Sequence, residues 1–67
     1  MAKMTIKRLP SPEDANNIGL ELESICEAFD KKSTGPFTAE VEITEDGFSL
    51  DGWLFTDLET SWYRVTR

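Results

Sequence analysis

The most regular pattern of hydrophobic and polar positions in the chain runs from Phe37 to Thr44, where the two kinds of residue alternate without a break. Alternation with a period of two is typical of a strand with one buried face, so the pattern predicts a strand over 37–44. Its predicted buried side consists of Phe37, Ala39, Val41 and Ile43. Asp46-Gly47 follows, a pair that favours a two-residue hairpin turn. That turn predicts a returning strand in which Leu50 and Leu54 point inward, with Leu54 opposite Ala39.

Apolar residues spaced three and four apart predict an amphipathic helix of about five turns before this strand. They are Ala15, Ile18, Leu22, Ile25 and Phe29, and Cys26 falls on the same face. Ser11 suits the N-cap, Pro12 suits the first helical position, and Asp14 comes close to a capping box. We therefore expect one helix that ends near Lys31-Lys32, with Gly19 packed closely on a sheet and Cys26 as a buried core thiol.

Two shorter alternating segments predict the outer strands of the sheet. Residues 4–9 place Met4 and Ile6 on one side, and residues 61–66 place Tyr63 and Val65 on one side. The predicted order is strand, helix and three strands (β-α-β-β-β). One amphipathic helix can cover one face of such a sheet, so the sequence predicts an α+β fold with a mainly antiparallel sheet of about four strands, in a single domain over residues 1–67.

The composition narrows the class of protein. The chain has 67 residues with one cysteine and no histidine, and it shows neither an apolar run of signal-peptide length nor a membrane-spanning segment. One cysteine cannot form an internal disulfide, so a disulfide-stapled secreted module is excluded. We therefore expect a cytoplasmic protein, in a host cell if the gene belongs to a phage, that has no membrane partner.

Charge is divided unevenly along the chain. The formal net charge is -6, yet all 13 acids and only two lysines fall within residues 11–60. Residues 1–10 hold three cations and residues 61–67 hold two, so an acidic body lies between two basic ends. The sequence does not give the strand order, so the first strand could lie beside several neighbours, and a positive edge formed by the two ends is one of the open arrangements. An acidic body repels phosphates, and direct binding of nucleic acid is therefore not expected.

The residues offer little for catalysis or metal binding. Without histidine there is no ordinary base for neutral pH, and zinc and copper lack their usual ligands. Glu40 and Glu42 lie on one predicted strand face, where a solvated surface is the simpler interpretation than an acid/base or metal pair. Asp46-Gly47 and Asp51-Gly52 are explained by turn chemistry. We therefore expect no catalytic residues, no cofactor and no metal.

Acidic side chains on the outer surface are the more informative feature. Glu23, Glu27 and Asp30 fall within about 60° of one another on a helical wheel and rise by about 6 and 4.5 Å, a ridge that suits a groove built for a nucleic-acid backbone. Glu40, Glu42 and Asp51 are predicted on the sheet face away from the helix. The expected register places Glu42 opposite Asp51, a like-charged pair that costs stability and hints at function. A purely solubilising acidic face is the alternative.

Aromatic residues sharpen this interpretation. If Leu50 and Leu54 point inward, Trp53 and Phe55 point outward among the acids, and Trp62 shares that face. Exposed aromatic side chains ringed by acids are typical of a protein interface. The alternative is a bulge at Asp51-Gly52, which would reverse the register and bury Trp53 and Phe55 in the core.

In size and charge the chain resembles the small phage-encoded anti-CRISPR proteins that mimic DNA. The residues behind the resemblance are the acids Glu23, Glu27, Asp30, Glu40, Glu42 and Asp51. The resemblance implies an inhibitor, not an enzyme, that binds the basic nucleic-acid-binding groove of a CRISPR effector or similar nuclease complex and blocks access of DNA. Those six acids with Trp53 and Phe55 are the predicted partner-binding residues. The alternative function is a regulatory or structural module that forms a homodimer through Trp53, Phe55 and Trp62.

Overall fold

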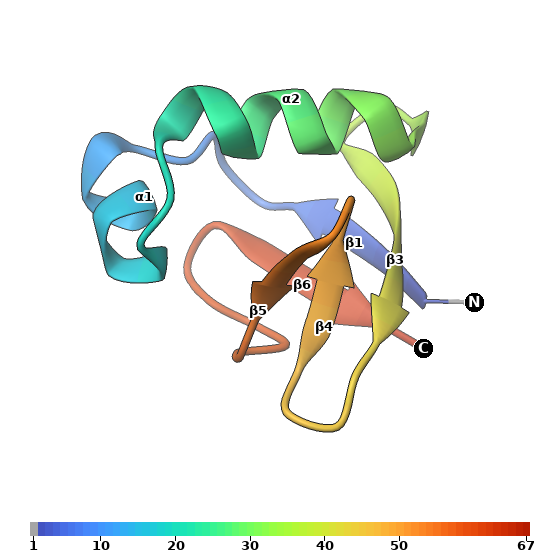
Figure 1. The fold of residues 1–67 in the computed structure, drawn as a ribbon. Helices are drawn as coiled ribbons and strands as arrows, with labels where there is room; N and C mark the ends of the chain where they lie inside the picture. The colour runs from blue at the N-terminus through green and yellow to red at the C-terminus, as the bar shows by residue number, and fades with distance from the viewer. Residues whose placement is uncertain (1) are drawn as a thin grey trace.

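The computed structural model describes residues 2–67, which form two helices and six strands (Figure 1). The helices are α1 (Pro12–Ile18) and α2 (Leu22–Lys32). The strands are β1 (Ala2–Ile6), β2 (Ser33–Gly35), β3 (Thr38–Ile43), β4 (Phe48–Leu50), β5 (Trp53–Phe55) and β6 (Tyr63–Thr66).

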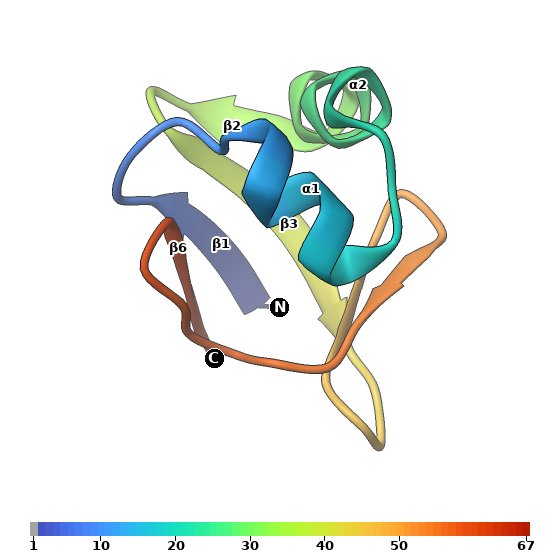
Figure 2. The ribbon, with the colours of Figure 1, turned by 90° about the vertical axis from the view of Figure 1, so that its left-hand side faces the viewer.

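The strands form one antiparallel sheet that curls into an open half-barrel, with the order β5-β4-β3-β1-β6 and β2 beside one end of β3. α2 lies across the sheet and packs against β3 and β4, whereas α1 is set beside the open side of the curl (Figures 1 and 2). The predicted α+β class is therefore confirmed. The sheet has more strands than predicted, because the segments after the helix and after Asp51 each form an additional short strand.

The single long helix of the prediction is wrong, because Gly19 ends α1 and a new helix begins at Leu22. Gly19 has φ 82°, a left-handed conformation that glycine adopts at little cost, and its N–H donates to the carbonyls of Ala15 and Asn16. A side chain at Gly19 would meet no atom within 4 Å, so close packing is not its role. The predicted start of the helix is confirmed, since Ser11 caps α1 and forms the full capping box with Asp14.

The two basic ends of the chain lie side by side, an arrangement that the sequence leaves open. β1 pairs with β6, and the register places Lys3 opposite Thr66 and Thr5 opposite Arg64 (Figure 2). β1 begins two residues before the predicted strand over 4–9 and ends three residues before it, and beyond β1 the N–H groups of Lys7 and Arg8 both donate to the carbonyl of Trp62.

The turn between β3 and β4 is wider than predicted. Ile43 lies opposite Phe48, so the loop comprises the four residues 44–47 and not Asp46-Gly47 alone. Glu42 consequently lies opposite Ser49, and the expected Glu42–Asp51 pair does not form. The shift is by two positions, which keeps the same faces inward and leaves Val41, Phe48 and Leu50 buried.

The two-residue hairpin turn occurs at the second Asp-Gly pair. Asp51 and Gly52 have φ of 49° and 86°, and Leu50 lies opposite Trp53 across the turn. Antiparallel partners share a face, so Phe55 lies with Phe48 in the core and Leu54 points outward. The prediction that Phe55 points outward and Leu54 inward is therefore wrong. Phe55 is buried, as in the alternative interpretation, but no bulge at Asp51-Gly52 is needed to bury it.

An aromatic cluster forms the centre of the core. Phe48, Phe55, Tyr63 and Trp62 are each at most 4% exposed, and Tyr63 meets the other three rings edge-on. Trp62 precedes β6, so it does not follow the strand alternation that placed it outside.

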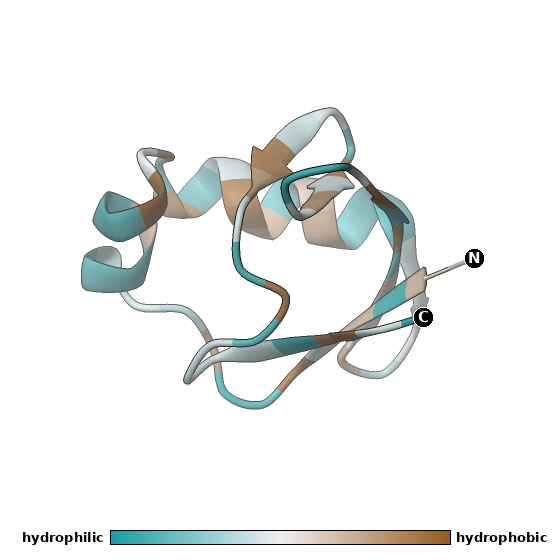
Figure 3. Cartoon of the chain, turned by 90° about the horizontal axis from the view of Figure 1, so that it is seen from below, coloured by the Kyte–Doolittle hydropathy of each residue, from teal (hydrophilic) through white to brown (hydrophobic). Residues whose placement is uncertain are grey.

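Hydrophobic stretches alternate with hydrophilic ones along α2, whereas α1 is mostly hydrophilic (Figure 3).

Cys26 is exposed, and its predicted burial in the core is wrong. Because the helix is broken at Gly19, the buried face of α2 does not continue that of α1, and it is centred on Ile25 and Ala28. Cys26 then lies on the flank of α2 beside the acidic side.

Candidate functional site

The acids of α2 form the ridge that the sequence predicts. Glu23, Glu27 and Asp30 are all exposed on the side of α2 opposite to its buried residues. Among residues 2–67, no cation lies within 4.0 Å of these three carboxylates. We call this set the α2 ridge.

The acids of the sheet also come together, although without the predicted Glu42–Asp51 pairing. Glu40, Glu42 and Asp51 line one shallow hollow of about 240 Å³, which we call the sheet acid cluster. Lys32 lines the same hollow, and Lys31 lies 3.8 Å from the Asp51 carboxylate. The sheet acid cluster is therefore partly neutralised by Lys31 and Lys32, whereas the part of the chain that the structure describes supplies no such cation to the α2 ridge.

Two cations of the basic N-terminal segment are held by acids of the body. Lys7 pairs with Glu59, which holds the pKa of that carboxyl below its usual range. Arg8 forms a forked pair with Asp14, with nitrogen–oxygen distances of 2.8 and 3.0 Å. These pairs reduce the basic character that the sequence indicates for the first ten residues.

The predicted aromatic face does not exist as a surface. Phe55 and Trp62 are buried, so they are not available to a partner, and the homodimer surface loses two of its three predicted residues. Trp53 is 42% exposed because it stands at the end of the short edge strand β5, on the same face as buried Leu50. Leu54, on the other face, is 72% exposed.

An apolar groove of about 350 Å³ runs along one flank of α2, and sequence reasoning missed it. Its walls include buried Ile25 and Trp62 and partly buried Ile6 and Phe29. Leu9 and Phe37 stand at its rim, 75% and 62% exposed, and Cys26 and Asp30 line the rim on α2. The sequence assigns the large apolar residues of the groove to four separate segments, 4–9, 15–29, 37–44 and 61–66, and no local pattern indicates that these segments meet in space.

Phe37 is held at this rim by an unusual backbone. It was predicted to be an inward residue of the strand, but it precedes β3 and has φ 58°. Pro36-Phe37 occupies the turn between β2 and β3, and a proline followed by a positive φ is the pattern of a turn that normally has glycine or asparagine at the second position. A large side chain at such a position costs stability and is found more often at functional sites.

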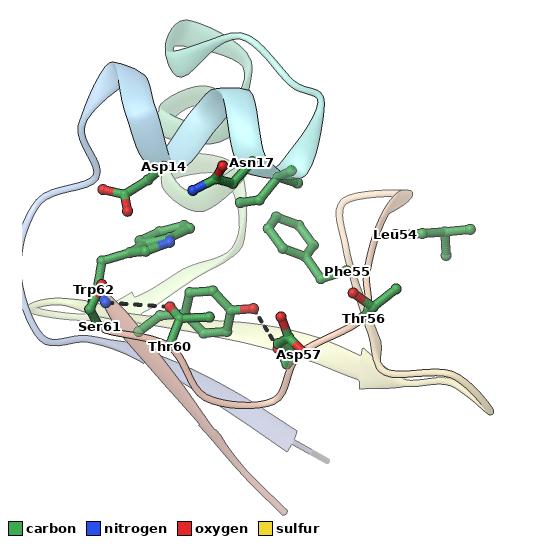
Figure 4. A pocket seen from close by; sticks show the side chains of 11 residues that line it. Asp14, Asn17, Leu54, Phe55, Thr56, Asp57, Thr60, Ser61 and Trp62 are labelled. Atoms are coloured by element: carbon green, nitrogen blue, oxygen red, sulfur yellow. Dashed lines mark hydrogen bonds between the residues drawn. The ribbon is translucent and has the colours of Figure 1, made fainter.

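A second hollow, of about 280 Å³, lies between α1 and the loop 56–61 (Figure 4). Asp14 and Asn17 of α1 face it from one side, and Asp57 and Thr60 lie on the other. The Tyr63 hydroxyl donates to the carbonyl of Asp57, and the backbone N–H of Trp62 donates to the Thr60 hydroxyl. These bonds fasten the loop over the aromatic core.

Two ionisable groups that line this second hollow, Asp14 and Tyr63, have shifted pKa values. Hydrogen bonds from Arg8 and from the Ser11 backbone lower the pKa of Asp14 to about 2. Burial, with a smaller effect of Asp57, raises the pKa of Tyr63 to about 12. Both shifts move the groups away from neutral pH, where a general acid or base works best.

Within residues 2–67, no group of three or more potential ligand side chains is placed to hold a metal ion. No helix in the same range has the length and apolar character needed to cross a membrane. Comparison of the chain with protein-family models, with curated proteins and with solved structures finds no match.

Proposed function

We propose that this protein is a small acidic inhibitor that binds a basic nucleic-acid-binding groove of another protein and keeps DNA out of it. The resemblance in size and charge suggests a CRISPR effector or a similar nuclease complex as the partner. The observation that carries the proposal is the α2 ridge, in which Glu23, Glu27 and Asp30 stand in line on one helix, with no cation of residues 2–67 within 4.0 Å.

The physical basis is competition for lysine and arginine side chains. Exposed carboxylates that form no ion pair within residues 2–67 can pair with a cationic surface, and a helix fixes their spacing before binding. The formal net charge of -6 also favours fast encounter with a basic groove. Because exposed charges act through solvent, the affinity falls as salt rises.

The test is competition between the protein and duplex DNA for a purified CRISPR effector complex, measured at rising salt. The variant Glu23→Gln, Glu27→Gln, Asp30→Asn removes the charges of the α2 ridge. A matched control, Glu13→Gln, Glu45→Gln, Asp46→Asn, removes three exposed acids elsewhere and changes the net charge by the same amount.

We expect the ridge variant to compete at least about tenfold less well than the wild type, and the control to change the competition by less than about threefold. Equal losses in both variants would mean that net charge alone acts, and the ridge would have no special role. If the wild type did not compete with DNA at any salt concentration, the proposed partner class would be wrong.

A further inference from the structure

We propose that the apolar groove beside α2 binds a basic amphipathic segment of the partner protein, whose apolar side chains enter the groove while its lysines or arginines meet the α2 ridge. This inference rests on the proposed function and adds to it the kind of partner segment that is recognised. Three observations support it: the apolar groove, the negative charge along its α2 edge, and the exposed ring of Phe37 on a backbone with positive φ.

The groove and the ridge form one continuous surface. Cys26 and Asp30 line the groove, and Glu23 and Glu27 flank Cys26 along the same helix. Across the groove, Leu9 and Phe37 present apolar side chains to solvent. A ligand in the groove therefore contacts apolar side chains and the Asp30 carboxylate, and a ligand that extends over the α2 edge of the groove reaches Glu27 and Glu23.

Charge decides which occupant fits. The cations nearest in sequence to Leu9 are Lys7 and Arg8, and both are paired with acids of the body. Lys31 faces the other flank of α2, where it meets Asp51. The charge at the groove lip is thus negative, which favours an apolar ligand that carries positive charge and disfavours anionic lipid or nucleic acid.

A second copy of this chain fits the groove poorly. Its exposed apolar residues on the other side, Trp53 and Leu54, lie between Asp51 and Asp57 along the chain. Its exposed cations Lys3 and Arg64 lie on the β1–β6 face beside threonines. A partner segment that combines apolar and basic residues must therefore come from another protein.

Phe37 adds an independent reason. A ring that is 62% exposed gains little from the fold, yet the backbone holds it at φ 58°, where asparagine or glycine is more stable. Aromatic side chains, phenylalanine among them, are enriched in protein interfaces relative to the rest of the surface. Replacement by asparagine removes the ring and relieves the backbone, so Phe37→Asn tests binding without a risk to folding.

The experiment uses three fluorescent peptides of about 14 residues, a length near the minimum for helix formation. The first has leucine on one helical face and lysine elsewhere, the second has serine in place of leucine, and the third has glutamate in place of lysine. Binding is measured by anisotropy, and the alkylation rate of Cys26, the only cysteine of the chain, reports occupancy of the groove.

We expect the leucine-lysine peptide to bind at least about tenfold more tightly than the other two, and to slow alkylation of Cys26. Phe37→Asn should weaken this peptide by about tenfold, whereas Leu54→Ser, which removes an exposed apolar side chain outside the groove, should change it by less than about threefold. Thermal melting confirms that both variants fold.

The two proposals fail in different ways. If the leucine and serine peptides bound equally and Cys26 stayed reactive, the groove proposal would be overturned while charge recognition by the α2 ridge survived. If the ridge variant bound the leucine-lysine peptide as tightly as the wild type, the α2 ridge would not receive the basic residues of the segment and the inference would be overturned, whereas the proposed function is decided separately by the competition with DNA. Failure of the leucine-lysine peptide to bind, or self-association that closes the groove, would also overturn the inference.

Discussion

The rings of Phe48 and Phe55 stack in the core with their centroids 4.8 Å apart and their planes 9° from parallel. The two residues are direct partners across the β4–β5 hairpin. Their contact fixes the faces of β5, because it places Phe55 inside and leaves neighbouring Leu54 exposed. Of the three residues of β5, Phe55 is the one buried in the core, and it anchors the edge strand in addition to its backbone pairing with β4.

Replacement of Phe55 by alanine should therefore be far more harmful than the same change at Leu54. Loss of a buried phenylalanine costs about 3–5 kcal/mol, a large part of the stability of a small domain. Leu54→Ala, at a residue that is 72% exposed, should stay within about 0.5 kcal/mol. Urea unfolding followed by tryptophan fluorescence measures both, and similar losses in the two variants would contradict the observed register.

Gly47 should tolerate no side chain. A Cβ atom at Gly47 would lie 2.0 Å from the backbone oxygen of Phe55 and 2.8 Å from the Cα of Thr56, so the β3–β4 turn and the end of β5 would have to separate. We expect Gly47→Ala to lower the free energy of unfolding by about 3 kcal/mol or more.

Gly19→Ala is the matched control for this prediction. A side chain there meets no atom, and only the left-handed backbone opposes it, at a cost of roughly 1–2 kcal/mol. Equal losses at the two positions in urea unfolding would show that the close approach of Gly47 to Phe55 is not a constraint.

Acid should destabilise the protein through Asp14. The Arg8 fork and the Ser11 hydrogen bonds lower the pKa of this carboxyl from 3.8 to about 2. A carboxyl with a lowered pKa in the folded state contributes stability above its unfolded pKa, and that contribution disappears as the pH falls through the folded value. Stability should therefore decline between about pH 4 and pH 2.

Arg8→Gln should raise the pKa of Asp14 toward its ordinary value, as measured by NMR titration of the carboxyl carbon. Lys7→Gln is the control, because it acts on Glu59 and not on Asp14. An Asp14 pKa that did not move in Arg8→Gln would show that the fork does not stabilise the carboxylate.

Alkali should loosen the loop 56–61 through Tyr63. Burial raises the pKa of this phenol from 10.0 to about 12, and its hydroxyl donates to the carbonyl of Asp57. Because the folded pKa lies above the unfolded value, the stabilisation is complete below about pH 10 and is lost as the pH rises toward 12. Ultraviolet titration of the phenolate measures the pKa, and Tyr63→Phe should remove this part of the alkaline transition.

Much of the local structure follows from the sequence. The capping box at Ser11 and Asp14, the alternation that buries Ala39 and Val41, and the exposed α2 ridge depend on residues close together in the chain. Such features need only local backbone geometry and the separation of apolar from polar side chains.

The tertiary structure decided what local patterns leave open. Both Asp-Gly pairs suit a tight turn, and only the stacking of Phe55 on Phe48 selects the second. The apolar residues of 15–29 are spaced three and four apart, a spacing that fits one long helix. The curled sheet instead accommodates two helices joined at Gly19. The apolar groove unites residues 9, 26 and 37, which no periodicity connects. Contacts between distant segments, and not local preference, therefore created the surface on which the proposed binding depends.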